Sequence, residues 1–166
     1  MAEIISVYKQ ALPKMRFVGK CYTEADRENG TFAHKWGEWW QNGWFDALEV
    51  GGDEPFDDAG APIGLCRMKE GEPFEYWIGM FLPEDFTAPE GFGTIDLDVG
   101  EIAVCLVKGT EPEIYFEDCT GKLAENRYKM KPDKNGVYWS FERYACPRYT
   151  NPDAEGNVIL DQCFFI

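Results

Sequence analysis

The sequence predicts an α+β fold in which one antiparallel sheet carries two helices on the same face. Two observations predict this fold. The patterns of a strand, a helix and two more strands follow one another twice along the chain, and no linker or change in composition divides the 166 residues into separate domains. Either unit alone would leave an apolar sheet face and helix face uncovered. We therefore expect two pseudo-repeats, about 1–85 and 86–166, to join edge to edge in a single domain, 1–166. This layout leaves a central groove between the helices, floored by the middle of the sheet.

The first unit begins with a strand over residues 15–22 (MRFVGKCY), which are largely apolar. Thr31 is the expected N-cap of a helix over 32–48, where aromatic side chains recur near helical spacing. After an acidic loop rich in Gly and Pro, residues 63–68 and 74–82 form the expected hairpin, because their short connection contains both Gly and Pro.

The second unit follows the same order. Residues 92–107 are expected to be strand with one interruption. A capping-box pattern that starts at Thr110 predicts the second helix there, and Gly121 is expected to end or bend it. Residues 137–146 and 158–166 are the last two expected strands, joined by a loop of Pro, Asn and Gly.

Charge and composition exclude several classes of function. Acidic residues outnumber basic ones 30 to 16, which gives a net charge of −14. That excess argues against binding to the nucleic-acid backbone or to an anionic membrane, and leaves room for cationic ligands. No stretch approaches the ~20 apolar residues of a membrane span, and the N-terminus lacks the pattern of a signal peptide, so we expect a cytoplasmic protein.

Metal and cofactor motifs are absent from the sequence. The six cysteines form no C-x-x-C pair, and there is a single histidine. This spacing predicts no metal site. The Gly-rich motifs of nucleotide-binding folds and the G-x-S-x-G nucleophile motif are missing too, so we expect no cofactor.

The segment 138–144 (YWSFERY) carries the main candidate site. As a strand it places Glu142 on one face with Tyr138, Ser140 and Tyr144. Burying an unpaired charge costs several kcal/mol. Glu142 therefore either meets a cationic or hydrogen-bond-donating ligand on the groove floor, or is an exposed glutamate that pairs across the sheet with a Lys or Arg.

Aromatic residues supply the rest of the candidate site. Tyr76 and Trp77 in the first hairpin have opposite parity, so only one of them can line the groove. The first helix carries four tryptophans within nine residues, more than one packed face needs, and aromatic faces attract cations. The predicted ligand-binding residues are Glu142, Tyr144, Tyr76, Trp36, Trp39 and Trp40.

The chain resembles the GyrI-like small-molecule-binding domain, also called the AraC-type effector-binding domain. The resemblance covers nearly the whole chain and rests on four segments in order: LPKMRFVGKCY, FEYWIGM, IDLDVGEIAVCLVKGT and WSFERY. It implies the duplicated strand-helix-strand-strand plan and a pocket for amphipathic, often cationic aromatic compounds. It also implies that Glu142 faces this pocket with Tyr144 beside it.

The leading functional prediction is a stand-alone effector or multidrug-binding protein for hydrophobic cations, linked to transcription regulation or drug sequestration. Two alternatives stay open. One is a hydrolase in which Glu142 activates water, and the other is an inhibitor of a DNA-handling enzyme that acts through the acidic segment 84–101. We expect binding rather than catalysis, with no direct contact to nucleic acid or membrane, and leave a protein partner open.

Overall fold

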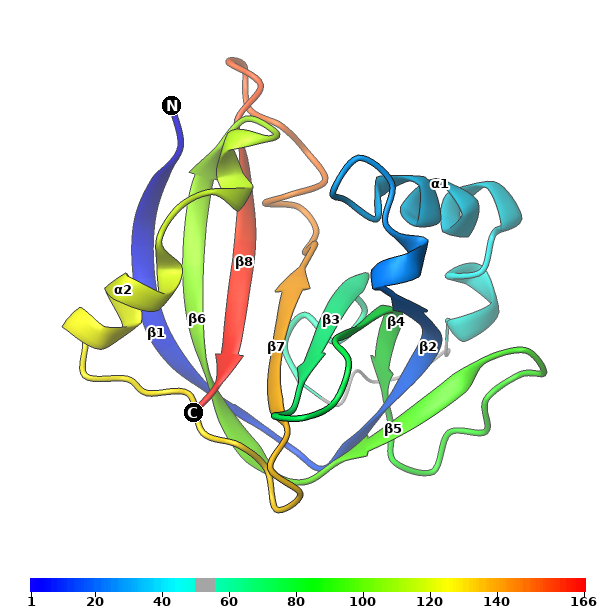
Figure 1. Ribbon diagram of the computed structural model, residues 1–166. Helices are drawn as coiled ribbons and strands as arrows, with labels where there is room; N and C mark the ends of the chain where they lie inside the picture. Colours follow the sequence, from blue (N-terminus) through cyan, green and yellow to red (C-terminus); the bar gives the residue numbers. More distant parts are fainter. Residues whose placement is uncertain (50–55) are drawn as a thin grey trace.

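The computed structural model describes residues 1–49 and 56–166. They form one eight-stranded antiparallel sheet and two α-helices, which confirms the predicted α+β class (Figure 1). The elements are β1 (Glu3–Leu12), β2 (Met15–Thr23), α1 (Ala33–Asn42), β3 (Ile63–Met68), β4 (Glu75–Leu82), β5 (Gly93–Leu97), β6 (Gly100–Gly109), α2 (Cys119–Glu125), β7 (Tyr138–Arg143) and β8 (Val158–Phe165).

The sheet has an internal symmetry. Its strand order is β1-β6-β8-β7-β3-β4-β2-β5. Let β1, β2, β3 and β4 change places with β5, β6, β7 and β8, respectively. The strand order is then the same when it is read from the opposite edge of the sheet. Each unit therefore contributes two strands, a helix and two more strands, one strand more than the sequence predicts.

The additional strand of the first unit is β1, which sequence reasoning missed. It lies at one edge of the sheet, where β6 is its one partner among the described strands. The register shifts between Ile4 and Ser6, so a bulge interrupts the two-residue period there. Most β1 side chains are exposed or partly exposed, and this edge strand therefore lacks the apolar alternation by which a half-buried strand is recognised.

The first helix is shorter than predicted. It begins at Ala33, with Phe32 at the N-cap position, and the Thr31 hydroxyl accepts the N–H of Ala33 at 3.4 Å. It ends at Asn42 because Gly43 adopts a left-handed conformation (φ 64°), which closes the last turn. A separate 3₁₀ turn over Asp46–Leu48 follows.

The second helix begins later than predicted. Only a 3₁₀ turn forms over Glu113–Tyr115, and α2 starts at Cys119. Its N-cap is Asp118, whose carboxylate accepts the N–H of Gly121 at 2.9 Å. A Cβ at Gly121 would lie 2.1 Å from that carboxylate, so this glycine makes room for the cap and does not end the helix.

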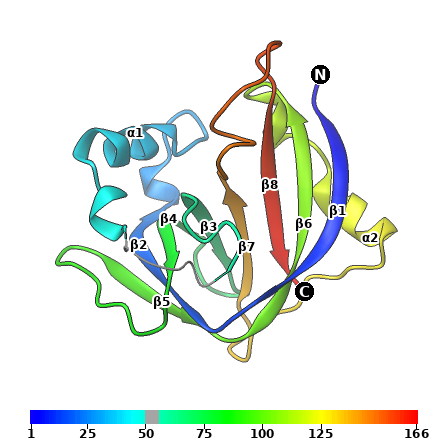
Figure 2. The ribbon, with the colours of Figure 1, turned by 180° about the vertical axis from the view of Figure 1, so that it is seen from behind.

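Both helices cover the same face of the sheet. One row of paired residues runs across the middle strands: Ile78, Gly64, Glu142, Gln162 and Cys105. Directly paired residues point to the same side. Ile78 packs in the apolar cluster under α1 and Cys105 in the cluster under α2, so the whole row faces the helices. Accordingly, α1 lies with β2, β3 and β4, and α2 with β1 and β6 (Figures 1 and 2).

The opposite face carries the largest apolar cluster, which includes Phe17, Leu65 and Phe141. Among these residues lies a buried ion pair, in which Arg143 Nε donates to Asp161 Oδ2 at 2.7 Å. The helix-facing side has no comparable charge pair in the part of the chain that the structure describes. The candidate site lies on this side of the sheet.

Candidate functional site

Glu142 lies on the helix-facing side of β7, and tyrosine hydroxyls rather than a cation hold its carboxylate. Oε2 accepts hydrogen bonds from Tyr144 Oη at 2.5 Å and from Tyr76 Oη at 3.2 Å. Among the described residues, no Lys or Arg acts on this carboxylate. The cross-strand ion pair of an ordinary strand glutamate is therefore not formed there.

Helix α1 supplies one aromatic wall. Trp36 Nε1 donates to Tyr76 Oη at 3.0 Å, which continues the chain of hydrogen bonds to Glu142. Phe32 stacks on the Tyr76 ring, with centroids 4.5 Å apart and planes 7° from parallel. The Trp36 ring meets the Tyr144 ring edge to face at 4.9 Å. These contacts fix both tyrosines against the helix.

Two loops supply a second wall that sequence reasoning missed. Tyr115 Oη lies 3.4 Å from Tyr144 Oη, and the Tyr149 ring packs edge to face on Tyr144 at 4.7 Å. Both Tyr115 and Tyr149 donate their hydroxyls to the carboxylate of Glu111. The sequence offered no signal beyond the presence of these tyrosines, and Tyr115 stands between two other large apolar residues, Ile114 and Phe116.

Gly64 permits the close approach at the centre of the site. It pairs with Glu142 across β3 and β7. A Cβ at Gly64 would lie 2.2 Å from Tyr76 Oη and 3.1 Å from Glu142 Oε2. Any side chain would therefore displace the tyrosine, and glycine is the residue that lets the two polar groups meet here.

The electrostatics follow from the burial of Glu142 without a counter-charge from the described residues. Burial raises the pKa of Glu142, and the hydrogen bonds from Tyr144 and Tyr76 act against that rise. Burial and the nearby Glu142 charge hold the pKa of both tyrosines well above 10, so both remain hydrogen-bond donors. A cation placed here would interact with the carboxylate and with the aromatic faces.

The structure brings Trp36, Tyr76 and Tyr144 around Glu142, but it places Trp39 and Trp40 elsewhere. Trp39 is fully buried, donates Nε1 to the Tyr22 hydroxyl at 3.0 Å and packs in the core under α1. Trp40 is 61% exposed. Trp36 and Trp40 are one turn apart on nearly the same side of α1, and both pack on Phe45, so position along the helix separates them rather than angle around it.

The parity of the first hairpin is also settled. Tyr76 faces the helices and contacts Glu142, whereas Trp77 packs against the cluster on the opposite face.

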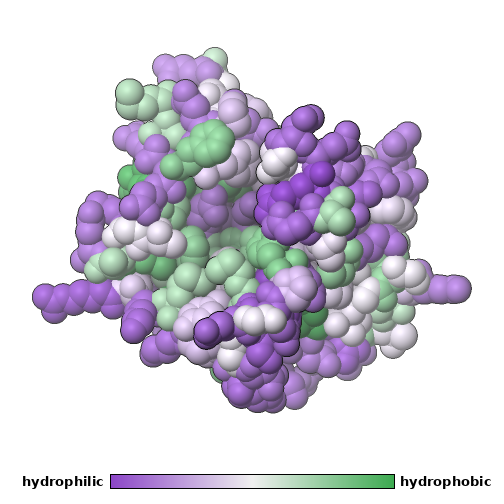
Figure 3. All heavy atoms as spheres, viewed as in Figure 1, coloured by the Kyte–Doolittle hydropathy of each residue, from purple (hydrophilic) through white to green (hydrophobic). Residues whose placement is uncertain are grey.

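The floor continues from Glu142 along β7 and β3. We call this floor the β7–β3 strip; its residues, paired two by two, are Glu142 with Gly64, Ser140 with Cys66, and Tyr138 with Met68. Ser140 and Cys66 are partly exposed, and Met68 and Tyr138 are exposed. Figure 3 shows the face seen in Figure 1 hollowed near its middle, with apolar side chains gathered on the floor.

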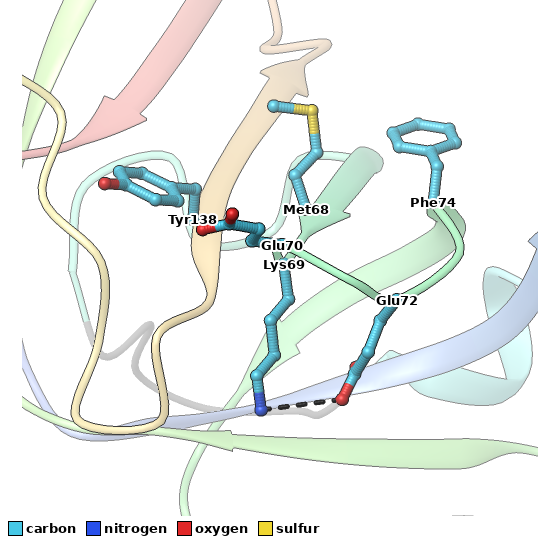
Figure 4. A pocket seen from close by; sticks show the side chains of 6 residues that line it. All are labelled: Met68, Lys69, Glu70, Glu72, Phe74 and Tyr138. Carbon is cyan, nitrogen blue, oxygen red and sulfur yellow. Dashed lines mark ion pairs between the residues drawn. The ribbon is translucent and has the colours of Figure 1, made fainter.

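A shallow pocket of about 300 Å³ lies at the far end of the strip (Figure 4). Its lining residues come from the end of β3, the β3–β4 connection and the start of β7: Met68, Lys69, Glu70, Glu72, Phe74 and Tyr138. The pocket and the Glu142 cluster therefore share one face and one floor.

The described residues offer neither a metal site nor a membrane-spanning helix. No three His, Cys, Asp or Glu side chains are grouped there so that they could hold a metal. No helix in the same residues is long and apolar enough to cross a membrane.

Comparison with known proteins establishes the fold. No protein-family model and no curated protein matches the chain. Its structure is similar to that of SAV2435 bound to tetraphenylphosphonium, with 17% identity, a TM-score of 0.69, and coverage of 97% of this chain and 93% of that one. A protein of Staphylococcus aureus MU50 named for bacterial transcription regulation is 19% identical, with a TM-score of 0.60 and 97% of each chain covered.

A third similar structure is the integron cassette protein VCH_CASS2 from the mobile metagenome of Vibrio cholerae. It is 12% identical, with a TM-score of 0.53 and 98% of each chain covered. Identities this low show a shared fold over nearly the whole length.

Proposed function

We propose that this chain is a GyrI-like small-molecule-binding protein whose ligands are hydrophobic cations bound over Glu142. The observation that carries the proposal is a half-buried carboxylate that no Lys or Arg of the described residues reaches, surrounded by Tyr76, Tyr144 and Trp36. The similar structure of SAV2435 holds tetraphenylphosphonium, a hydrophobic cation, and so supports this choice of ligand.

The magnitudes favour a charged aromatic ligand. A cation over an aromatic face gains about 0.5–2 kcal/mol, and more when water is excluded. Truncating one partner of a buried charge pair costs ~2–5 kcal/mol. A cation at Glu142 would combine both contributions, whereas a neutral ligand of the same shape would gain only from the apolar contact.

The test is a titration with tetraphenylphosphonium, followed by quenching of tryptophan fluorescence and by calorimetry. Glu142→Gln keeps the shape and removes the charge, and should weaken binding at least about tenfold. Glu90→Gln is the matched control, because it removes one negative charge at an exposed position in the connection before β5. It should leave the affinity for tetraphenylphosphonium unchanged. Neutral triphenylphosphine oxide should bind both variants alike. Equal tetraphenylphosphonium affinity in the wild type and Glu142→Gln would overturn the proposal.

Hydrolysis is the second candidate, because the raised pKa of Glu142 suits a general base. Mass spectrometry of candidate esters and strained-ring compounds after incubation separates the two functions. Turnover that Glu142→Gln abolishes would indicate an enzyme, and unchanged compounds would indicate a binding protein.

We further propose a single domain over residues 1–166 that acts in the cytoplasm, with a link to transcription regulation. The sheet that runs through both units supports the single domain, and the S. aureus neighbour named for transcription regulation supports the link. The net charge of −14 supports indirect action, without contact to DNA. A gel shift with duplex DNA at physiological salt should show no binding.

A further inference from the structure

We propose that the β7–β3 strip and the pocket at its far end bind the tail of a linear amphiphilic cation. The cationic head would lie on Glu142 and the alkyl chain would extend toward Met68 and Tyr138. The ligands of this chain would then include alkyl quaternary ammonium compounds. This inference rests on the proposed function, because Glu142 receives the head.

The strip has the length that such a ligand needs. From Glu142 to Tyr138 the chain advances by four residues along β7, about 13 Å at the usual rise of a strand. That is roughly the length of an extended decyl chain. The intermediate pair, Ser140 and Cys66, is partly exposed and carries no formal charge. Burial raises the pKa of the Cys66 thiol to about 12, so the thiol stays neutral.

The far pocket is suited to the end of a tail. Met68 and Phe74 point to one side of the β3–β4 connection, and Lys69 and Glu72 point to the other side, paired at 3.5 Å (Figure 4). Lys69 and Glu72 therefore neutralise each other away from the apolar side chains. Glu70 also lines the pocket, on the side of Met68 and Tyr138, and the Arg27 guanidinium, paired with Glu24, lies 5.4 Å from the Phe74 ring centroid. Methionine adapts to ligands of different shape because its side chain is unbranched and flexible.

Exposure indicates that this end of the strip lacks a partner within the described residues. Met68 is 49% exposed and Tyr138 is 39% exposed, although both are large apolar side chains. Their continuity with the Glu142 site identifies the occupant as the other end of the same ligand. A second copy of the chain is the competing occupant, and the experiment below distinguishes the two.

The experiment measures the affinities of n-alkyltrimethylammonium ions from butyl to dodecyl, each below its micelle concentration. Each methylene that the strip buries should tighten binding about fourfold, the factor that corresponds to ~0.8 kcal/mol per buried CH₂. The gain should level off once the tail is longer than the strip.

Two matched variants locate the tail. Met68→Gln should weaken dodecyltrimethylammonium roughly fivefold and leave tetraphenylphosphonium within about twofold. Ile5→Gln is the control, since Ile5 is also an exposed strand residue, at 44%, but lies on the distant edge strand β1. It should change neither affinity. Since both positions are exposed, both variants should fold, which thermal melting verifies.

Three results would overturn the inference: affinity independent of chain length, an unchanged gain per methylene in Met68→Gln, or a Met68-dependent dimer in sedimentation. These results are distinct from failure of the proposed function. If tetraphenylphosphonium binding does not depend on Glu142, the head site is wrong. If it does depend on Glu142 and chain length has no effect, only the tail site is wrong.

Discussion

Replacing Gly64 by alanine perturbs the candidate site at its point of closest approach. The added Cβ would lie 2.2 Å from Tyr76 Oη and 2.9 Å from Tyr76 Cζ. The phenol cannot move aside freely, because its ring is stacked on Phe32 and its oxygen is hydrogen-bonded by Trp36 and to Glu142. Gly64→Ala should therefore break the hydrogen-bond chain across the site.

The expected loss of stability has two contributions. Forcing an extra carbon into a packed site costs about 1–3 kcal/mol. Losing one hydrogen bond in the chain adds about 1 kcal/mol. We expect the free energy of unfolding to fall by about 2–4 kcal/mol.

Gly37→Ala is the matched control. Gly37 lies inside α1, and apart from its chain neighbours and the backbone of the helix, a Cβ there would meet no atom of the described residues within 4 Å. Alanine is favoured over glycine in a helix interior, so this substitution should raise the free energy of unfolding by up to about 1 kcal/mol. The same change of residue should thus have opposite signs at the two positions.

Urea unfolding measures both effects, and tetraphenylphosphonium titration measures the consequence for binding. Gly64→Ala should lower the unfolding midpoint and weaken binding at least about tenfold, while Gly37→Ala should leave binding intact. If Gly64→Ala were as stable as the wild type and bound the cation equally well, the central hydrogen-bond chain would not organise the site.

Three further predictions follow from the charges. Burial raises the pKa of Glu142 above its ordinary value of 4.5, so the folded protein retains this proton to higher pH than the unfolded chain does. The free energy of unfolding of the wild type should therefore fall, relative to that of Glu142→Gln, as the pH rises from 4.5 through the raised pKa. Urea unfolding at a series of pH values measures this difference. Tyr144→Phe removes a hydrogen bond that lowers the pKa of Glu142, so the pH below which cation affinity declines should move upward in binding titrations. Asp161→Asn breaks the buried pair with Arg143 and should cost about 3–5 kcal/mol, whereas Asp96→Asn, in an exposed pair, should cost no more than ~1 kcal/mol; equal unfolding midpoints for these two variants would contradict the burial argument.

Local sequence patterns predicted those elements whose own residues carry the full signal. The strands β2, β3, β4, β7 and β8 are apolar segments bounded by turn residues, and each was found close to its expected range. The pattern failed for β1, where a bulge at the edge of the sheet breaks the two-residue period. It also failed at the start of α2, because Thr110 begins a capping-box pattern in sequence but the helix is capped by Asp118.

The same distinction, between local patterns and features that depend on packing, applies to the residues of the candidate site. Strand parity correctly grouped Glu142 with Tyr144, because alternation along one strand is a local property. Trp39 could not be separated from Trp36 by sequence, since the face of α1 that meets the sheet depends on how the helix packs. Glu111 reaches the site through a loop, and no periodicity indicates where a loop side chain will lie.

Two neighbouring residues of β7, Glu142 and Arg143, carry opposite charges on opposite faces of the sheet, and only Arg143 is paired with an opposite charge among the described residues. Arg143 points into the far core, and the chain itself supplies the counter-charge, Asp161, at 2.7 Å. Glu142 points to the helix side, where tyrosine hydroxyls reach it and no described cation does. Breaking a buried ion pair typically costs ~3–5 kcal/mol, which indicates how unfavourable an unpaired buried charge is. The two tyrosine hydrogen bonds offset part of this penalty but supply no positive charge. A cation bound at Glu142 would supply the counter-charge for this carboxylate, as Asp161 does for Arg143.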